Sequence, residues 1–112
     1  MRLLFAGTPD VAVPTLAALA ADPRHEVAAV LTRPDAPVGR HRTPRPCPVA
    51  KKAEELGIPV IRAINVKSGE GHDAIASLNV DAAVVVAYGG LIPADLLAVP
   101  RYGWVHLHFW LL

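Results

Sequence analysis

The chain has 112 residues, of which 53% are hydrophobic and 19% charged, and its formal net charge is +1. This composition excludes a disordered chain, and no apolar run reaches the roughly 18 residues that a membrane span needs. A single cysteine excludes an internal disulfide. From the length, the composition and the lack of a signal-peptide pattern, we expect one globular domain in the cytoplasm, with no membrane partner.

Two stretches near the N-terminus predict the first strand and the first helix. The apolar run at 2–6 is short and ends at Gly-Thr-Pro, as a strand before a turn does. Asp10 stands where the N-cap of a helix over 10–21 belongs. Pro14 falls in the first turn of that helix, where a missing N–H costs least, so it is compatible with the prediction.

The next apolar run, over 25–32, predicts a second strand, because it is short and is followed by an Arg-Pro turn signal. Residues 33–48 then read RPDAPVGRHRTPRPCP, with five prolines and four arginines. No periodic pattern fits this segment. We therefore expect a long surface loop, and loops of that length are usually functional or disordered.

The second half of the chain continues to alternate between helices and strands. Residues 80–90, VDAAVVVAYGG, hold the longest uninterrupted apolar run, which is typical of a parallel strand covered on both faces. Such alternation predicts an α/β fold of the doubly wound, Rossmann-like kind, with a mainly parallel sheet of about five strands and flanking helices. The remaining predicted elements are helices over 49–56, 70–78 and 93–98 and strands over 58–62 and 103–108.

In open sheets of this kind, ligands bind beyond the carboxyl ends of the strands. We therefore expect the segments at 7–10, 88–93 and 106–112 to form one site. The first of them, within FAGTPD, has one glycine, so it lacks the three-glycine fingerprint of a dinucleotide-binding turn. Gly89 and Gly90 allow a planar ligand to approach the backbone closely.

Two histidines close to the end of the sequence are the other candidate site. Alternation along a strand places Trp104, His106 and His108 on one face. One interpretation is structural, with one imidazole partly buried and the other solvated. Two functional interpretations stay open: general acid–base catalysis near neutral pH, or a metal site that draws its third ligand from elsewhere, the candidates being Cys47, His72 and Asp10.

Five motifs occur in the order and spacing of one family: FAGTPD, VLTRPDAPVGR, PCPVA, VVVAYGGLIP and GWVHLHFWLL. Together they resemble the N-terminal part of the catalytic domain of the methionyl-tRNA formyltransferases. The resemblance covers essentially all 112 residues. The RPDAPVGR stretch favours this family over other formyltransferases that share the fold.

This resemblance implies an enzyme of translation initiation. The family transfers a formyl group from 10-formyltetrahydrofolate to the amino group of methionine on initiator tRNA, without a metal, and its full-length members are monomeric. Its catalytic residues are an Asn, a His and an Asp. By resemblance, His108 matches the histidine, His106 stands where the Asn belongs, and the Asp would lie beyond Leu112.

The resemblance also implies two sets of binding residues. Arg42 matches a loop arginine that contacts the acceptor end of the tRNA, and Arg40 lies beside it; otherwise these arginines belong to a solvated loop. Folate would be bound mainly by backbone groups that precede and follow Gly89. The implied folate-binding residues are Val86, Ala87, Tyr88, Gly89, Gly90 and Leu91, together with Trp110, Leu111 and Leu112.

Two residues depart from the family pattern, because His106 replaces an Asn and Trp110 stands where a Ser is usual. We therefore expect residues 1–112 to be the N-terminal portion of a formyltransferase catalytic domain that is inactive alone. The rest of that domain and the tRNA-binding β-barrel domain of the family would be absent. The alternative is a small metal-binding or folate-binding module without catalysis.

Overall fold

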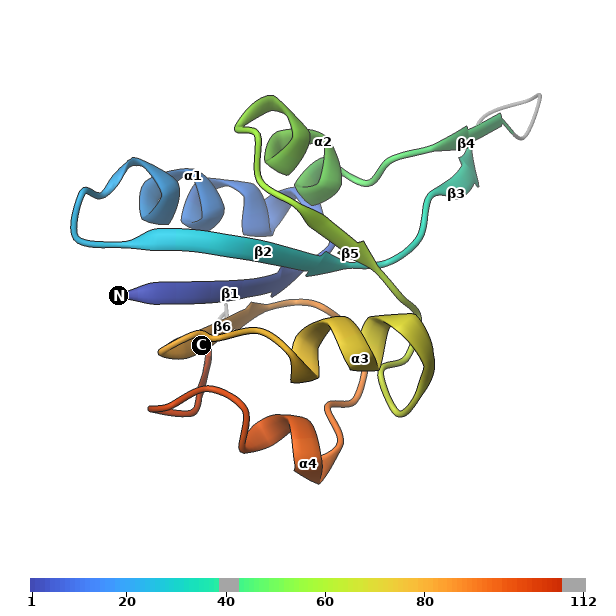
Figure 1. Ribbon diagram of the computed structural model, residues 1–112. Helices are drawn as coiled ribbons and strands as arrows, with labels where there is room; N and C mark the ends of the chain where they lie inside the picture. The colour runs from blue at the N-terminus through green and yellow to red at the C-terminus, as the bar shows by residue number, and fades with distance from the viewer. Residues whose placement is uncertain (39–42, 108–112) are drawn as a thin grey trace, which may run out of the picture.

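The computed structural model describes residues 1–38 and 43–107, and its centre is a five-stranded sheet (Figure 1). The strand order is β5-β2-β1-β6-β7, and each neighbouring pair is parallel. Every strand run predicted from the sequence is present in this sheet. The strands are β1 (Arg2–Gly7), β2 (Glu26–Thr32), β5 (Val60–Arg62), β6 (Ala82–Val86) and β7 (Trp104–His106).

Helices cover both faces of the sheet, which confirms the doubly wound prediction. Figure 1 shows α1 and α2 on one face and α3 and α4 on the other. A short 3-10 helix, η1, precedes α1. The bounds are η1 (Asp10–Ala12), α1 (Val13–Ala21), α2 (Pro48–Glu55), α3 (Gly69–Ala76) and α4 (Ala94–Leu97).

The alternation of side chains along β1 divides the core into two layers. Phe5 packs in a buried cluster with Leu16 of α1, whereas Leu4 belongs to a second cluster with Ile75 of α3. All four of these side chains are fully buried. Because successive residues of a strand point to opposite faces, one short apolar run supplies the core on both sides of the sheet.

The order of the strands reverses between β1 and β6. From β1 the chain adds β2 and β5 on one side, and it then returns to add β6 and β7 on the other side of β1. At such a switch point the connections leave the two neighbouring strands in opposite directions, which opens a crevice beyond their carboxyl ends. Gly7 lies opposite Val86 at this end. The fold therefore predicts a ligand site next to this pair.

The start of the first helix differs from the prediction. Asp10 is not an N-cap: it is the first residue of η1, whose N-cap is Pro9, without a side-chain hydrogen bond. The N–H of Ala12 donates to the carbonyl of Pro9 at 3.0 Å, so the first turn has the tighter i→i+3 geometry. The prediction for Pro14 is confirmed, since it lies in the first turn of α1.

The prediction that 33–48 has no regular element was wrong. Strands β3 (Ala36–Val38) and β4 (Thr43–Arg45) pair antiparallel in a separate two-stranded sheet. Pro37 lies opposite Pro44. Neither proline has an N–H, so this pair exchanges no ladder bonds, and neighbouring residues must supply them. Figure 1 shows the hairpin extending away from the body of the molecule.

Arg62, at the end of β5, joins the base of the hairpin to the body. Its Nε donates to Asp35 Oδ1 at 3.0 Å, and its Nη2 donates to Glu54 of α2. The bond to Glu54 and then the bond to Asp35 raise the pKa of the Arg62 guanidinium above its ordinary value. The end of β5, the base of the hairpin and α2 therefore meet at the Arg62 side chain, which is permanently charged.

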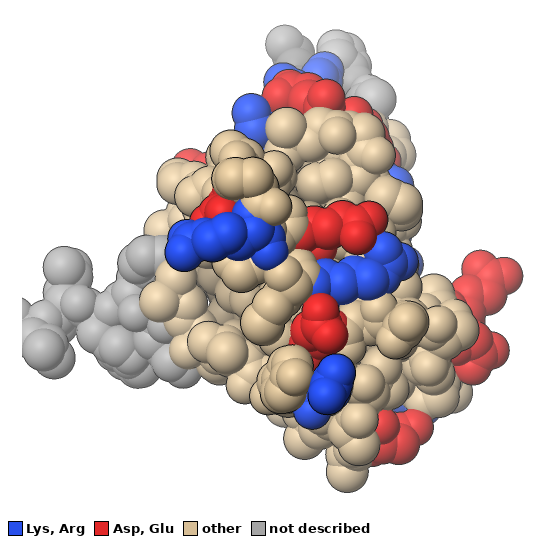
Figure 2. Space-filling view, turned by 60° about the vertical axis from the view of Figure 1, so that its left-hand side comes forward, with Lys and Arg blue, Asp and Glu red and all other residues tan. Residues whose placement is uncertain are grey.

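Basic and acidic side chains lie next to one another over the face seen in Figure 2, without one continuous charged field. Within the described residues, ion pairs join such side chains, for example Arg2 with Glu26 at 3.0 Å and Arg24 with Asp22 at 2.7 Å. Within residues 1–38 and 43–107, no helix has the length and apolar character required to cross a bilayer.

Candidate active site

Two of the three segments expected to form one site meet at the switch point. The hydroxyl of Thr8, just after β1, donates to the carbonyl oxygen of Tyr88, just after β6, at 3.3 Å. Gly7 precedes this contact and has no room for a side chain, because a Cβ there would lie 2.7 Å from the carbonyl oxygen of Val86. The glycine of the FAGTPD motif therefore lets the two segments approach each other.

The third segment adds His106 beside them. His106 is the last residue of β7 and lies opposite Val85 of β6, and its side chain is exposed. The following N–H, of Leu107, donates to the carbonyl of Val85 at 2.9 Å, which continues the ladder. His106 thus lies at the same edge of the sheet as the glycine-containing segment after β6. Six predicted site residues lie outside the described part of the chain: Arg40, Arg42, His108, Trp110, Leu111 and Leu112.

The backbone after β6 turns sharply. Ala87 has a φ of 55° and Gly89 a φ of 86°, both in the left-handed region. This region is accessible to glycine but costs a residue with a Cβ about 1 kcal/mol or more. We call residues 87–90 the bend. A conformation of this kind persists only where the surrounding contacts stabilise it, and Tyr88 supplies them.

The side chain of Tyr88 anchors the bend in the core. It is 2% exposed, and its hydroxyl donates to the carbonyl of Ala63 at 2.8 Å. Gly90 lies against the ring, since a Cβ there would be 2.6 Å from Cε2 of Tyr88. Burial raises the pKa of the Tyr88 hydroxyl, and the positive charge of Arg33 partly offsets that increase. The hydroxyl therefore stays protonated and remains a donor.

This packing decides which groups of the predicted folate-binding residues a ligand can reach. The side chains of Val86 and Tyr88 belong to the two core clusters. A ligand at this edge therefore meets only the backbone of these residues. Leu91, in contrast, is 79% exposed. The bend offers N–H and C=O groups at the switch point, with an apolar side chain next to them.

A chain of hydroxyl and thiol groups under the bend was not found from the sequence. Thr32, fully buried at the end of β2, donates to Thr8 at 3.5 Å and lies 2.9 Å from the sulfur of Cys47. Each hydroxyl has one hydrogen, and that of Thr32 is used on Thr8, so the thiol of Cys47 donates to Thr32. Cys47 also caps α2 by accepting from the N–H of Ala50 at 3.4 Å.

The polar chain links β1, β2, β6 and α2 and sets where the bend lies relative to the hairpin. The only sequence signal for this polar chain was a threonine at the end of two strands, Thr8 just after β1 and Thr32 at the end of β2. Such a signal is weak, because threonine is common in strands for reasons of packing alone.

Arg33 brings positive charge to the bend. It follows β2, and a Cβ on Gly89 would lie 3.6 Å from Nη2 of Arg33. Next to it is a hollow of about 310 Å³ between the base of the hairpin and the start of α2. The lining residues are Thr8, Arg33, Pro34, Ala36, Arg45, Pro46, Cys47 and Pro48.

The metal interpretation stays a prediction, because it needs His108, which lies outside the described residues. Residues 1–38 and 43–107 contain no group of three His, Cys, Asp or Glu side chains placed to hold an ion. Two of the candidate third ligands have other partners. Cys47 bonds to Thr32, and His72 bonds to Asp95 at 2.6 Å.

The family model for formyl transferases matches residues 1–112, so the chain belongs to the formyl transferase family. This confirms the resemblance that the motifs indicated.

Proteins similar to the chain have a more specific name. Methionyl-tRNA formyltransferase of Cutibacterium acnes is 86% identical over 112 residues, which are 100% of this chain and 36% of that protein. The methionyl-tRNA formyltransferase of Acidothermus cellulolyticus is 59% identical over 97% of the chain and 33% of its own length. That of Leifsonia xyli is 60% identical over 100% of the chain and 36% of its own length. The chain thus spans about a third of the length of these relatives.

Proposed function

We propose that residues 1–112 form the folate-binding side of the active site of a methionyl-tRNA formyltransferase, which acts in translation initiation. The observation that carries the proposal is that relatives similar to nearly all of this chain are each named methionyl-tRNA formyltransferase. The geometry supports it, because the family motifs FAGTPD and VVVAYGGLIP meet at the switch point of the sheet. The cytoplasm, where translation starts, is the compartment that we expect.

The donor substrate in this proposal is 10-formyltetrahydrofolate, bound along the bend. A planar, hydrogen-bonding ring is suited to a site where glycines let it approach the backbone closely. The anchored ring of Tyr88 and the absence of a side chain at Gly90 keep this surface fixed. We propose that Val86, Ala87, Tyr88, Gly89, Gly90 and Leu91 line the pocket, with Trp110, Leu111 and Leu112 completing it.

The chemistry needs an oxyanion donor and a proton acceptor. The methionine nitrogen forms a bond to the formyl carbon, the bond from that carbon to N10 of the folate breaks, and the proton lost by the amine ends on N10. A fixed amide donor stabilises the oxyanion, and the loss of one such donor typically slows a reaction about 100-fold to 1,000-fold. We propose His108 as the group that moves the proton and His106 as a weaker replacement for the amide.

The acceptor substrate would be initiator tRNA carrying methionine. We propose that Arg40 and Arg42 contact phosphates near its acceptor end, and each such contact makes binding more sensitive to salt. Full-length relatives would supply the rest of the catalytic domain and the tRNA-binding β-barrel domain. The 112 residues would then be the N-terminal portion of the catalytic domain.

A chimera tests the proposal without requiring the chain to act alone. Residues 1–112 replace the corresponding segment of the Cutibacterium acnes relative, and formylation of methionyl-tRNA is measured. We expect the chimera with His106→Asn and Trp110→Ser to be active, and the unmodified chimera to be about 100-fold slower, since it lacks an amide donor. A folded double variant without activity, next to an active relative, would contradict the proposal. His25→Asn, at the other end of the sheet, is the matched control.

A further inference from the structure

Two arginines differ from the other arginines of the described chain. Arg2, Arg24 and Arg62 each form an ion pair with a carboxylate. Arg101 stacks on the ring of Tyr102, with 5.1 Å from its Cζ to the ring centroid.

Within residues 1–38 and 43–107, Arg33 and Arg45 make no ion pair or hydrogen bond. Both line the same hollow of about 310 Å³. The two unpaired cations therefore lie around one space next to the bend.

The neighbouring acids do not neutralise these two cations. Asp35, two residues from Arg33, accepts from Arg62 at 3.0 Å, and Glu54 bonds to the same guanidinium. None of the residues that line the hollow is acidic. An arginine held near a concave surface without a carboxylate partner retains all five of its N–H donors for a ligand.

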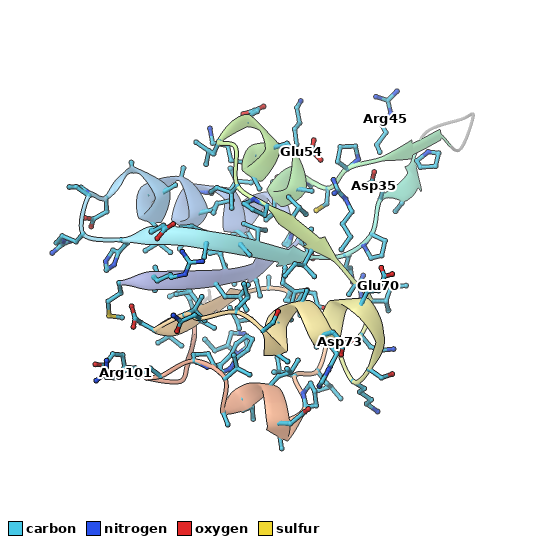
Figure 3. All side chains as sticks on the ribbon, viewed as in Figure 1. Asp35, Arg45, Glu54, Glu70, Asp73 and Arg101 are labelled. Carbon is cyan, nitrogen blue, oxygen red and sulfur yellow. The ribbon has the colours of Figure 1, made fainter. Side chains whose placement is uncertain are left out.

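The two cations approach the hollow from different sides. Arg33 lies on the side of the bend, with its guanidinium against Gly89. Arg45 lies on the side of α2, where it also lines a second hollow with Lys51 and Glu54. Figure 3 shows Arg45 at the base of the hairpin, pointing away from the sheet.

We propose that Arg33 and Arg45 form an oxyanion-binding site that holds a phosphate or carboxylate group of a substrate next to the bend. Guanidinium groups bind such oxyanions through paired, charge-assisted hydrogen bonds. This assignment of a substrate group rests on the proposed function, which offers two sources: a phosphate of the tRNA acceptor end and the glutamate carboxylate of the folate. The site requires neither Arg40 nor Arg42.

Direct binding to the 112-residue chain tests the site independently of activity. The probes are inorganic phosphate, a short single-stranded oligoribonucleotide and tetrahydrofolate, each titrated by NMR into the wild-type chain and into Arg33→Gln. We expect at least one probe to bind and Arg33→Gln to weaken it about tenfold, as the loss of a charge-assisted hydrogen bond does. Arg33→Lys should retain part of the affinity, because it keeps the charge, and Arg45→Gln should have a smaller effect of the same sign.

Arg101→Gln is the matched control, because Arg101 is also an arginine without a carboxylate partner and Figure 3 places it far from the base of the hairpin. If Arg33→Gln bound every probe as tightly as Arg101→Gln, or if the wild-type chain bound none, the inference would be wrong. The NMR spectrum of each variant shows whether that variant is folded. If Arg33→Gln does not fold, the binding of the probes to Arg33→Lys is measured instead.

Kinetics in the active chimera then distinguish the two sources. A phosphate ligand predicts that Arg33→Gln raises KM for the tRNA about tenfold and lowers the salt dependence of binding by about 0.7 in the logarithmic slope. A carboxylate ligand predicts a higher KM for the folate instead. If neither KM changes, the site does not serve this reaction. An inactive chimera would count against the proposed function, while the binding data still decide the site.

Discussion

The centre of the sheet and the β3–β4 hairpin both border the candidate active site, but different forces hold them in place. In β1, residues 3–7 are shielded from water between two helical layers, with Leu4, Phe5 and Ala6 fully buried. The described strands of the hairpin, residues 36–38 and 43–45, instead pair only with each other, and Arg62 joins the base of the hairpin to the body through exposed or half-buried carboxylates. Burial of apolar surface contributes far more free energy than partly exposed ion pairs do.

The difference teaches that stability and positioning have separate sources in this molecule. The core clusters determine whether the strands form at all. The polar contacts at the carboxyl edge determine how the hairpin, the bend and Arg33 lie relative to one another. Substitutions in the first region should therefore change the free energy of unfolding, and substitutions in the second should change local order and ligand binding.

Phe5→Ala should have the largest effect. Phe5 is fully buried with Leu16 and Val86, so the truncation leaves a cavity and should lower the free energy of unfolding by about 3–5 kcal/mol. Urea denaturation followed by circular dichroism measures the loss. Val11→Ala, at a side chain that is 44% exposed, is the control and should change stability by less than about 0.5 kcal/mol. A loss below about 1 kcal/mol for Phe5→Ala would contradict the account of the core.

Gly90→Ala should have the next largest effect, at the point where the core meets the site. The new methyl group would lie 2.6 Å from the Tyr88 ring, so the ring or the bend must shift, at a cost of about 1–3 kcal/mol. Thermal unfolding measures this cost, and the proposed function also predicts weaker folate binding. Leu91→Ala is the control, because its side chain is 79% exposed. Equal stability of the two variants would show that the ring does not constrain Gly90.

Arg62→Gln should affect the hairpin rather than the sheet. It removes the bonds to Asp35 and Glu54, and because the groups are partly exposed, the cost in global stability should be about 1 kcal/mol or less. Amide hydrogen exchange should nevertheless become faster in β3 and β4 and stay unchanged in β1. Arg24→Gln, which removes an ion pair at the other end of the sheet, should leave exchange in the hairpin unchanged. Uniform acceleration in every strand would refute this division.

The smallest expected effect concerns a pH-dependent contact between α3 and α4. Bonds from His72 to Asp95 at 2.6 Å and to Asp73 at 3.2 Å raise the pKa of His72 above its ordinary value of about 6.5. Its contribution to stability is thus complete below that value and is lost as the pH rises through the raised pKa. The bond to His72 also lowers the pKa of Asp95. The Asp95 carboxylate therefore contributes to stability above about pH 4, and this contribution is lost as the pH falls through the lowered pKa.

NMR titration of the His72 ring measures this contact directly. Asp95→Asn should move the pKa of His72 down toward its ordinary value, and Asp73→Asn should move it less, because the bond to Asp73 is the longer one. A larger shift in Asp73→Asn would mean that the order of the two bonds is wrong.

Much of the fold could be predicted from local pattern. Short apolar runs mark all five strands of the main sheet, and those of β1, β2 and β6 are followed by a turn signal with glycine or proline. The alternation with helical segments indicates a parallel sheet. The hairpin was missed because local signals opposed it: prolines disfavour strands, and Pro37 and Pro44 are tolerated only because they lie opposite each other where no ladder bond is needed. That arrangement depends on the register between β3 and β4, which cannot be derived from the number of prolines in the segment.

The candidate site was predicted in part. The meeting of the segments after β1 and β6 followed from the rule that strand ends converge at a switch point, and the contact between Thr8 and Tyr88 confirms it. The roles of Thr32, Arg33 and Ala63 could not be predicted, because each depends on a partner that is distant in sequence. The burial of the Tyr88 ring in the core was not predicted either, whereas the expected contact of its backbone with a ligand stays a prediction.

The sequence by itself determined where the helices and the strands of the main sheet form, and its motifs determined the family, since both are encoded in residues that are close together along the chain. Only the tertiary structure decided which strand ends are neighbours, which face of β1 packs against which helices, and which arginines lack a carboxylate partner. The physical reason is that apolar periodicity acts over a few residues, whereas strand order and ion pairing depend on contacts between residues that the fold alone brings together.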